Sequence, residues 1–178
     1  IREAARRKVP ILGICNGFQI LVKMKLLPGK LLENNTKKFI CRKVMCRFKK
    51  EFGDTESDKY DSLFVANSFG RYYINETNHI KLKANNQVIM TYADKSYNNG
   101  STYNIAGVCN KDRTIFGLMP HPERTNSQIF KTIINNIVIK NQLSCKINEL
   151  MSSEHISYKS TRKYLRTLYT CGEHVIQG

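Results

Sequence analysis

The chain has 178 residues, of which 41% are hydrophobic, 10% aromatic and 24% charged, and its net charge is +15. This apolar content is enough for a folded core and argues against a chain that is disordered throughout. No run of eighteen apolar residues occurs and the first ten residues lack the apolar part of a signal peptide, so neither a transmembrane helix nor a secretory signal is predicted.

The front of the chain predicts a helix, a buried strand and a second helix. Residues 1–8 are typical of the end of a helix, and the apolar run 9–14 contains β-branched residues, which indicates a strand. A turn then leads into 18–24, which has helical character and ends before a Leu-Pro-Gly sequence at 27–29.

The rest of the chain is predicted to be mainly strand, with a last helix. Strands are predicted at 39–48, 63–66, 71–74 and 87–92, with a hairpin formed by 105–109 and 114–119. The polar, acidic stretch 51–61 predicts a loop, and apolar residues at helical spacing predict an amphipathic helix at 126–140. This order favours an open α/β sheet, in which ligands bind at the carboxyl ends of strands.

The positive charge is concentrated at the start of the chain. Residues 1–50 hold 14 Lys and Arg against Glu3 and Glu33. Such a segment could steer an anionic ligand, but the chain is also rich in Lys, Asn and Ile, as AT-rich coding would produce. The basic residues are not interleaved with aromatic ones as in a single-strand binding groove. We therefore favour compositional bias over nucleic-acid binding, and we expect no membrane partner.

Six cysteines occur, and no two of them are spaced as Cys-x-x-Cys. They are Cys15, Cys41, Cys46, Cys109, Cys145 and Cys171. The spacing gives no support for a zinc site or a redox-active pair, so no metal is expected. Nothing in the sequence directs secretion, so we expect reduced thiols and a cytoplasmic protein.

The strongest local motif is Gly13-Ile14-Cys15-Asn16-Gly17. A cysteine between a strand and a helix, flanked by glycines, is typical of a nucleophile elbow, in which a strained turn exposes the reactive atom. The helix N-terminus favours the thiolate, and the Asn16 N–H would face a developing oxyanion. A small buried cysteine in a strand-to-helix turn explains the pentapeptide equally well.

The segment Pro120-His121-Pro122-Glu123 can supply a base. His121 follows an apolar strand, so it also stands at a strand end, and Glu123 can accept a hydrogen bond from its ring. A thiol nucleophile needs a histidine within reach and an acceptor that orients it. Without the cysteine motif, His121 would be interpreted as a turn histidine. We expect His79, in a polar stretch, to lie at the surface.

Several collinear stretches between residues 1 and 140 resemble the class I glutamine amidotransferases. Within them, the chain is most similar to the glutaminase subunit of phosphoribosylformylglycinamidine synthase, a purine-biosynthesis enzyme. The stretches are GICNGFQIL (13–21), LLPG (26–29), GRYY (70–73), NGS (99–101), NIAGVCN (104–110) and GLMPHPER (117–124). Chance similarity to one motif would not give this collinear order.

The resemblance implies a partial open sheet of the flavodoxin-like type and a glutamine site. It assigns the catalytic triad to Cys15, His121 and Glu123, and glutamine binding to Asn16, Gly17 and Gln19. It further implies that ammonia from glutamine passes to a synthetase, which uses ATP and magnesium to convert formylglycinamide ribonucleotide to its amidine. The glutaminase part itself would need no cofactor.

The tail, 143–178, resembles the beginning of the synthetase subunit of the same enzyme, so we expect two parts, 1–142 and 143–178. The resemblance assigns catalysis to His155 and an ATP contact to Tyr158. From the residues alone, 153–168 is a candidate for a basic, solvated amphipathic helix. The chain would then be either a fusion of the two subunits or an artefactual join of two neighbouring genes.

The sequence also departs from the family. The stretch Ala66-Asn67-Ser68-Phe69 lacks a histidine that the subfamily usually has there, and Ile156 replaces a cysteine in the synthetase motif. The family's first strands, and a glycine loop that donates to the oxyanion, would precede residue 1. We therefore expect an incomplete piece with negligible glutaminase activity by itself.

Three alternatives remain open. The first is the glutaminase subunit of another amidotransferase, which would explain the elbow and the Pro-His-Pro-Glu motif but not 104–110 or the tail. The second is a non-enzymatic basic protein that binds nucleic acid, which salt-dependent retention on nucleic acid would support. The third is an inactive fragment.

Overall fold

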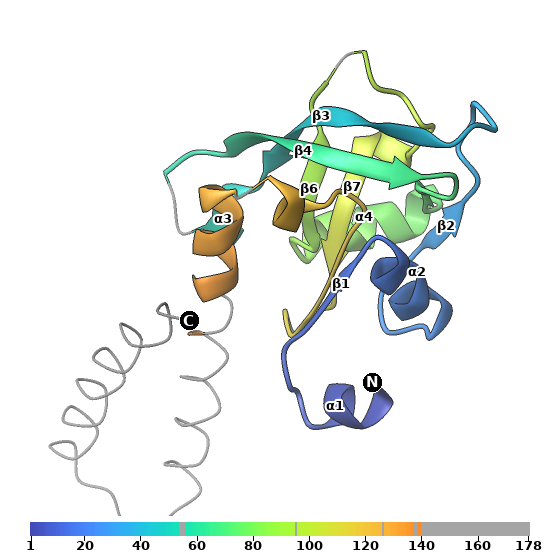
Figure 1. Cartoon of the computed structure of the whole chain (residues 1–178). Coiled ribbons are helices and arrows are strands. Elements are labelled where there is room, and N and C mark those ends of the chain that lie inside the picture. The colour runs from blue at the N-terminus through green and yellow to red at the C-terminus, as the bar shows by residue number, and fades with distance from the viewer. Residues whose placement is uncertain (54–55, 95, 126, 137–138, 140–178) are drawn as a thin grey trace, which may run out of the picture. The chain divides into compact units, whose positions relative to one another are not determined.

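The structure, a computed structural model, describes residues 1–53, 56–94, 96–125, 127–136 and 139 (Figure 1). The contacts divide the chain into two units, Ile1–Ile137 and Val138–Gly178. The description below concerns the first unit. His155 and Tyr158 lie outside the described residues, and the predicted boundary at 142 stays a prediction.

Five α-helical segments and eight strands are found among the described residues, together with two short 3₁₀ turns. The helices are α1 (Arg2–Arg6), α2 (Asn16–Lys23), α3 (Lys50–Gly53) and α4 (Glu76–Ala84), and residues 128–136 are also helical. The strands are β1 (Ile11–Ile14), β2 (Lys30–Leu32), β3 (Ile40–Phe48), β4 (Lys59–Asn67), β5 (Arg71–Tyr73), β6 (Val88–Tyr92), β7 (Ile105–Cys109) and β8 (Ile115–Leu118). The 3₁₀ turns are η1 (Thr102–Asn104) and η2 (Pro122–Arg124).

Six of the strands form one open sheet in the order β1-β8-β7-β6-β3-β4. Strands β1 and β8 run parallel, whereas the other neighbours in this sheet are antiparallel. The sheet curls, so that the segment after β8 meets β4 at the other end of the strand order. There the N–H of His121 donates to the carbonyl of Phe64 at 2.7 Å. Figure 1 shows the long β3–β4 arm crossing over β6 and β7. The expected α/β class and partial open sheet are confirmed.

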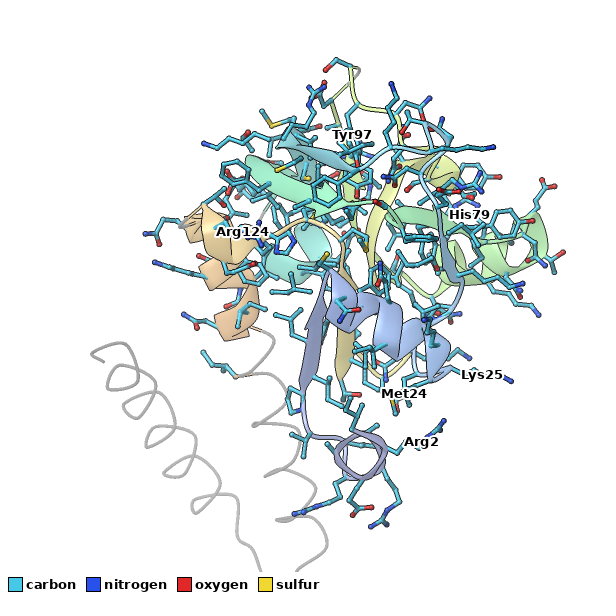
Figure 2. All side chains as sticks on the ribbon, turned by 45° about the vertical axis from the view of Figure 1, so that its right-hand side comes forward. Arg2, Met24, Lys25, His79, Tyr97 and Arg124 are labelled. Carbon is cyan, nitrogen blue, oxygen red and sulfur yellow. The ribbon has the colours of Figure 1, made fainter. Side chains whose placement is uncertain are left out.

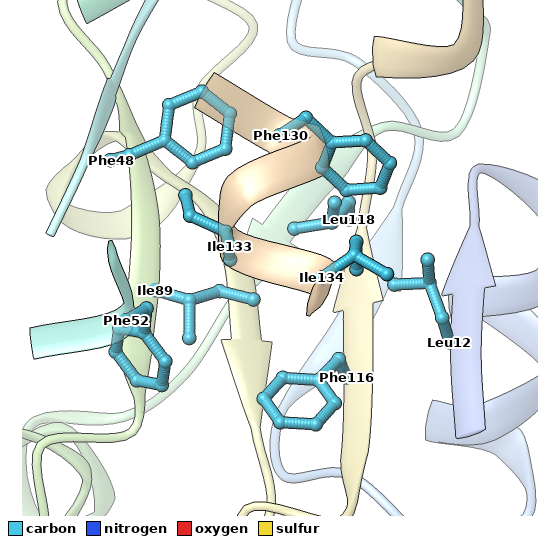
Figure 3. Close-up of a pocket in the computed structure, with 9 residues that line it drawn as sticks. All are labelled: Leu12, Phe48, Phe52, Ile89, Phe116, Leu118, Phe130, Ile133 and Ile134. Carbon is cyan, nitrogen blue, oxygen red and sulfur yellow. The ribbon is translucent and has the colours of Figure 1, made fainter. Parts of the chain in front are cut away.

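The sheet separates two apolar clusters. On β8, Phe116 and Leu118 join the cluster formed with β3, β4 and β6, while Ile115 and Met119 join the cluster under α2. This division is the alternation that a strand buried on both faces requires. The helix at 128–136 packs on the first cluster, where Phe130 and other apolar side chains converge (Figure 3).

The structure corrects one prediction and adds one missed helix. The stretch 51–61 is not all loop, because α3 begins before it and β4 begins at Lys59, pairing with Phe48. The polar start of β4 hid its strand character. Helix α4 was missed because it buries Leu82 alone and so has no apolar stripe. Its N-terminus is instead capped by the side chain of Asn75, which accepts from the N–H of Asn78 at 3.0 Å.

The short strand β2 was also missed; it pairs antiparallel with β5 in a separate two-stranded sheet. The predicted surface position of His79 needs refinement, because the ring is half-buried and stacks on Tyr103 with 3.6 Å between centroids (Figure 2). The other predicted strands, the hairpin 105–119 and the helices around 2–6 and 16–23 are confirmed, with ends that differ by at most four residues. The helix predicted at 126–140 is confirmed over 128–136, and residues 126, 137, 138 and 140 lie outside the described part of the chain.

Candidate active site

The parallel pair β1–β8 brings two of the predicted site residues to one edge of the sheet. Ile14 is in register with Leu118, and the N–H of Cys15 donates to the carbonyl of Leu118 at 2.7 Å. Cys15 therefore lies immediately past β1, and His121 lies three residues past the end of β8. This is the edge at which open α/β sheets bind their ligands.

Cys15 stands in the strained turn that a nucleophile elbow requires. Its φ of 51° and ψ of −106° lie outside the regions that L residues favour, and α2 begins at the next residue. Gly13 is needed for packing, because a Cβ there would lie 2.6 Å from the carbonyl carbon of Gly17 and from Leu21 Cδ1. A Cβ at Gly17 would meet nothing within 4 Å. The strain is thus carried by the cysteine itself, while Gly13 lets the helix approach the strand.

The surroundings of the Cys15 thiol favour its protonated form. Partial burial raises its pKa above the ordinary value, and this outweighs the opposite effects of the Asn16 N–H and the Arg124 charge. The sulfur lies 3.9 Å from the carbonyl oxygen of Ala66, to which the S–H can donate. The expected effect of the helix N-terminus exists, but desolvation is larger. A base must therefore remove the proton before this sulfur can attack.

His121, at the same edge of the sheet, has a ring that is oriented by an acidic neighbour. Its Nδ1 lies 2.7 Å from Glu123 Oε1, and the ring is nearly buried while the carboxylate is half-exposed. An ionised Glu123 makes Nδ1 the donor and leaves the Nε2 lone pair free. That Nε2 atom is buried and has no hydrogen-bond partner among the described residues. The ring is thus oriented by Glu123 and left with an unused acceptor.

Arg124 lies beside the same carboxylate. Its Nε is 3.8 Å from Glu123 Oε1, and its positive charge also lowers the pKa of Cys15 (Figure 2). The charge of Glu123 acts on Cys15 in the opposite direction and raises the pKa of its thiol, so the motif around Cys15 and the His121–Glu123 segment lie close enough to interact electrostatically.

Of the expected glutamine-binding residues, Asn16 and Gly17 form the first turn of α2 beside the thiol. Gln19 lies one turn further, and its side-chain N–H donates to the carbonyl of Phe69 at 2.9 Å. Gln19 therefore ties α2 to the turn that follows β4. Sequence reasoning missed this turn as part of the site, because the contact joins residues fifty positions apart.

The described residues contain no group of three or more His, Cys, Asp or Glu that could hold a metal ion. The same part of the chain has no helix long and apolar enough to cross a membrane.

Comparisons with known proteins define the class. The family model for the CobB/CobQ-like glutamine amidotransferase domain matches residues 4–165. The chain therefore belongs to this glutamine amidotransferase family. The match extends past residue 142, where a second part was expected from the sequence.

Among solved structures, the chain is similar to PurLQS from Thermotoga maritima, with 36% sequence identity and a TM-score of 0.62. The alignment covers 75% of this chain and 65% of that chain, so this chain spans less than two thirds of the length of that protein. The resemblance to amidotransferases of the phosphoribosylformylglycinamidine synthase type is confirmed.

A second similar structure is a protein from Thermoplasma acidophilum assigned as one subunit of GMP synthase. It is 16% identical with a TM-score of 0.50, and the alignment covers 79% of this chain and 61% of that one. At this identity the likeness concerns the fold alone.

Proposed function

We propose that Cys15, His121 and Glu123 form a triad that hydrolyses L-glutamine. The observation that carries the proposal is the state of His121: Glu123 fixes one ring nitrogen, and the other is buried without a partner among the described residues, at the edge where Cys15 stands. Leaving a buried acceptor without a hydrogen bond lowers the stability of the fold. An unpaired ring nitrogen of this kind is therefore expected at a position where a reaction uses it. Membership in the glutamine amidotransferase family supports the choice of substrate.

The reaction would begin when Nε2 of His121 takes the proton from Cys15 Sγ. The thiolate adds to the amide carbon of glutamine, and the Asn16 N–H donates to the oxyanion that forms. The C–N bond breaks as His121 returns its proton to the nitrogen, which releases ammonia and leaves a thioester. A water molecule, deprotonated by His121, then cleaves the thioester to glutamate and the free thiol. Glu123 keeps the ring oriented through both steps.

The ammonia would be used by a synthetase partner that converts formylglycinamide ribonucleotide to its amidine in purine biosynthesis. The similarity to PurLQS supports this acceptor. ATP and magnesium would be bound by the partner, and the glutaminase part would use neither. His155 and Tyr158, outside the described residues, are proposed to belong to a synthetase-like segment. Free thiols at Cys46 and Cys109 fit a reducing compartment such as the cytoplasm.

The proposal is tested by ammonia release from glutamine. We expect the chain, mixed with the synthetase partner, ATP, magnesium and formylglycinamide ribonucleotide, to release ammonia and form the amidine, and we expect the Cys15→Ala variant to do neither. Amidine formation from added ammonium chloride should survive in the mixture with that variant. Equal ammonia release by both proteins would contradict the triad, and glutaminase activity unaffected by the ribonucleotide would contradict this acceptor.

A further inference from the structure

The last residue of β4 and the turn that follows it, together residues 67–70, form a wall beside the candidate nucleophile. The carbonyl of Ala66, just before it, faces the Cys15 thiol at 3.9 Å, and the carbonyl of Phe69 accepts from Gln19 at 2.9 Å. A glutamine whose amide carbon reaches Cys15 must lie against the residues that surround the thiol. The conformation of this turn therefore bears on how the substrate is held.

Asn34 binds this turn from outside the sheet. Its side-chain Nδ2 donates to the carbonyl of Asn67 at 2.9 Å and to that of Lys38 at 3.1 Å, and its Oδ1 accepts from the N–H of Gly70 at 3.1 Å. Its backbone N–H donates to the carbonyl of Ser68 at 2.8 Å. The residue is 1% exposed. Buried amides are tolerated when their hydrogen bonds are made, and this one makes three with its side chain.

A second buried amide, Asn99, completes the arrangement. Its Nδ2 donates to the carbonyl of Gly70 at 3.0 Å, and its Oδ1 accepts from the N–H of Ser101 at 3.0 Å. The hydroxyl of Ser101 in turn accepts from the N–H of Tyr72, also at 3.0 Å. The N–H of Asn35 donates to the Asn99 carbonyl at 3.1 Å, which links the two amide-bearing segments.

The carbonyls of residues 66–70 are thus each engaged by a group from a distant segment. Cys15 meets the first, Gln19 the fourth, and the two buried asparagines the remaining three. Residues 68–70 belong to no strand, so these bonds impose the shape of the turn. Gly70 tightens it further, because a Cβ there would lie 2.0 Å from Asn67 Oδ1.

We propose that Asn34, assisted by Asn99, is a positioning residue that sets the turn 67–70 as a wall of the glutamine site and so determines how tightly glutamine binds. This inference rests on the proposed glutaminase function. The two asparagines act through the turn and touch neither the thiol nor His121 in the described contacts.

The test compares two reagents on Cys15 of the 178-residue chain. A diazo-ketone analogue of glutamine must occupy the substrate site before it alkylates the thiol, whereas iodoacetamide needs access to the sulfur alone. For Asn34→Asp, which keeps the shape but loses the donors, we expect the half-saturating analogue concentration to rise about tenfold. The ratio of analogue to iodoacetamide rate constants should fall by a similar factor. Asn99→Asp, which removes one donor, should give a smaller change in the same direction.

The matched control is Asn35→Asp, which adds the same formal charge one residue along on an exposed side chain and should keep the ratio. An unchanged ratio in a folded Asn34→Asp protein would overturn the inference, as would parallel losses with both reagents. If Asn34→Asp fails to fold, an unchanged ratio in folded Asn99→Asp overturns it. Failure of the analogue to label Cys15 in the unsubstituted chain would instead contradict the proposed function.

Discussion

Cys15 differs sharply in setting from Cys46 and Cys109, although all three belong to the same sheet region. Cys46 lies within β3 and Cys109 is the last residue of β7; both are fully buried in extended backbone, and burial raises the pKa of each thiol to about 12. Cys15 lies one residue past β1, has a φ of 51° and is half-buried. The Asn16 N–H and the charges of Glu123 and Arg124 act on its thiol. The comparison teaches that backbone position sets the strain and exposure of a thiol, because all three residues are cysteines and only Cys15 among them has a positive φ.

The largest effect is expected from removing the strand-end thiol. Cys15→Ser should lower glutamine hydrolysis by about 10⁴-fold or more, because a hydroxyl is a far weaker nucleophile beside the same base. Ammonia release in the mixture with the synthetase partner measures this, here and in the next prediction, because the chain by itself is expected to have negligible activity. The control is Cys41→Ser, which changes an exposed side chain near the start of β3 and should keep the rate within about twofold. Comparable losses of rate in the two variants would contradict a special role for the position of Cys15 past β1.

Loss of the base should come next. His121→Ala should lower the hydrolysis rate by about 10²–10⁴-fold, the usual range for general acid–base catalysis. The double variant with Cys15→Ala should be about as poor as the worse single variant, since members of one catalytic unit fail together. If the rate loss of the double variant were the product of the two single losses, the two side chains would act independently, which would contradict a shared site.

The packing of the elbow gives a stability prediction with a built-in control. Gly13→Ala should lower the free energy of unfolding by about 1–3 kcal/mol, because its Cβ would press on the Gly17 backbone and on Leu21. Gly17→Ala should change it by less than about 1 kcal/mol, because a Cβ there meets open space. Denaturant unfolding of the two variants measures the difference. Equal destabilisation would mean that the close approach of α2 to β1 is misplaced.

The smallest effect separates the cysteines by pH. At pH 9 the thiols of Cys46 and Cys109, with pKa values of about 12, should be thiolate in roughly one molecule in a thousand. Cys15 should react with iodoacetamide before either of them, and its rate should climb with pH past the ordinary cysteine range because its pKa is raised. Peptide mapping of a time course shows the order of labelling. Simultaneous labelling of the folded protein would contradict the contrast.

Much of the site was predictable because its signals are local. An apolar run before Cys15, a glycine at 13 and an apolar strand before His121 suffice to place both residues at strand ends. For β4, by contrast, the sequence predicts only 63–66, because the residues at the start of the strand are mainly polar and its first two are exposed. Helix α4 carries no apolar periodicity, so no pattern could announce it.

The asparagine network was missed for a different reason. Asn34 and Asn99 occur in a chain with 17 asparagines, so neither is conspicuous by composition. Their partners at the end of β4 and in the turn, Asn67 and Gly70, lie 29 to 36 positions away, and a hydrogen bond of that span has no sequence signature. Their burial became visible once the strands around them were placed. The sequence thus locates the residues of the proposed triad, whereas the asparagines proposed to shape the substrate wall are found only from the tertiary structure.

The most direct test of the central claim is to identify the cysteine that reacts with a glutamine-like electrophile. The chain is treated with the diazo-ketone analogue, with and without excess L-glutamine, and the labelled peptide is mapped. The account predicts modification at Cys15, suppressed by glutamine and slowed in His121→Ala. Modification mainly at Cys41, Cys46 or Cys109, or labelling of Cys15 that glutamine does not reduce, would contradict it.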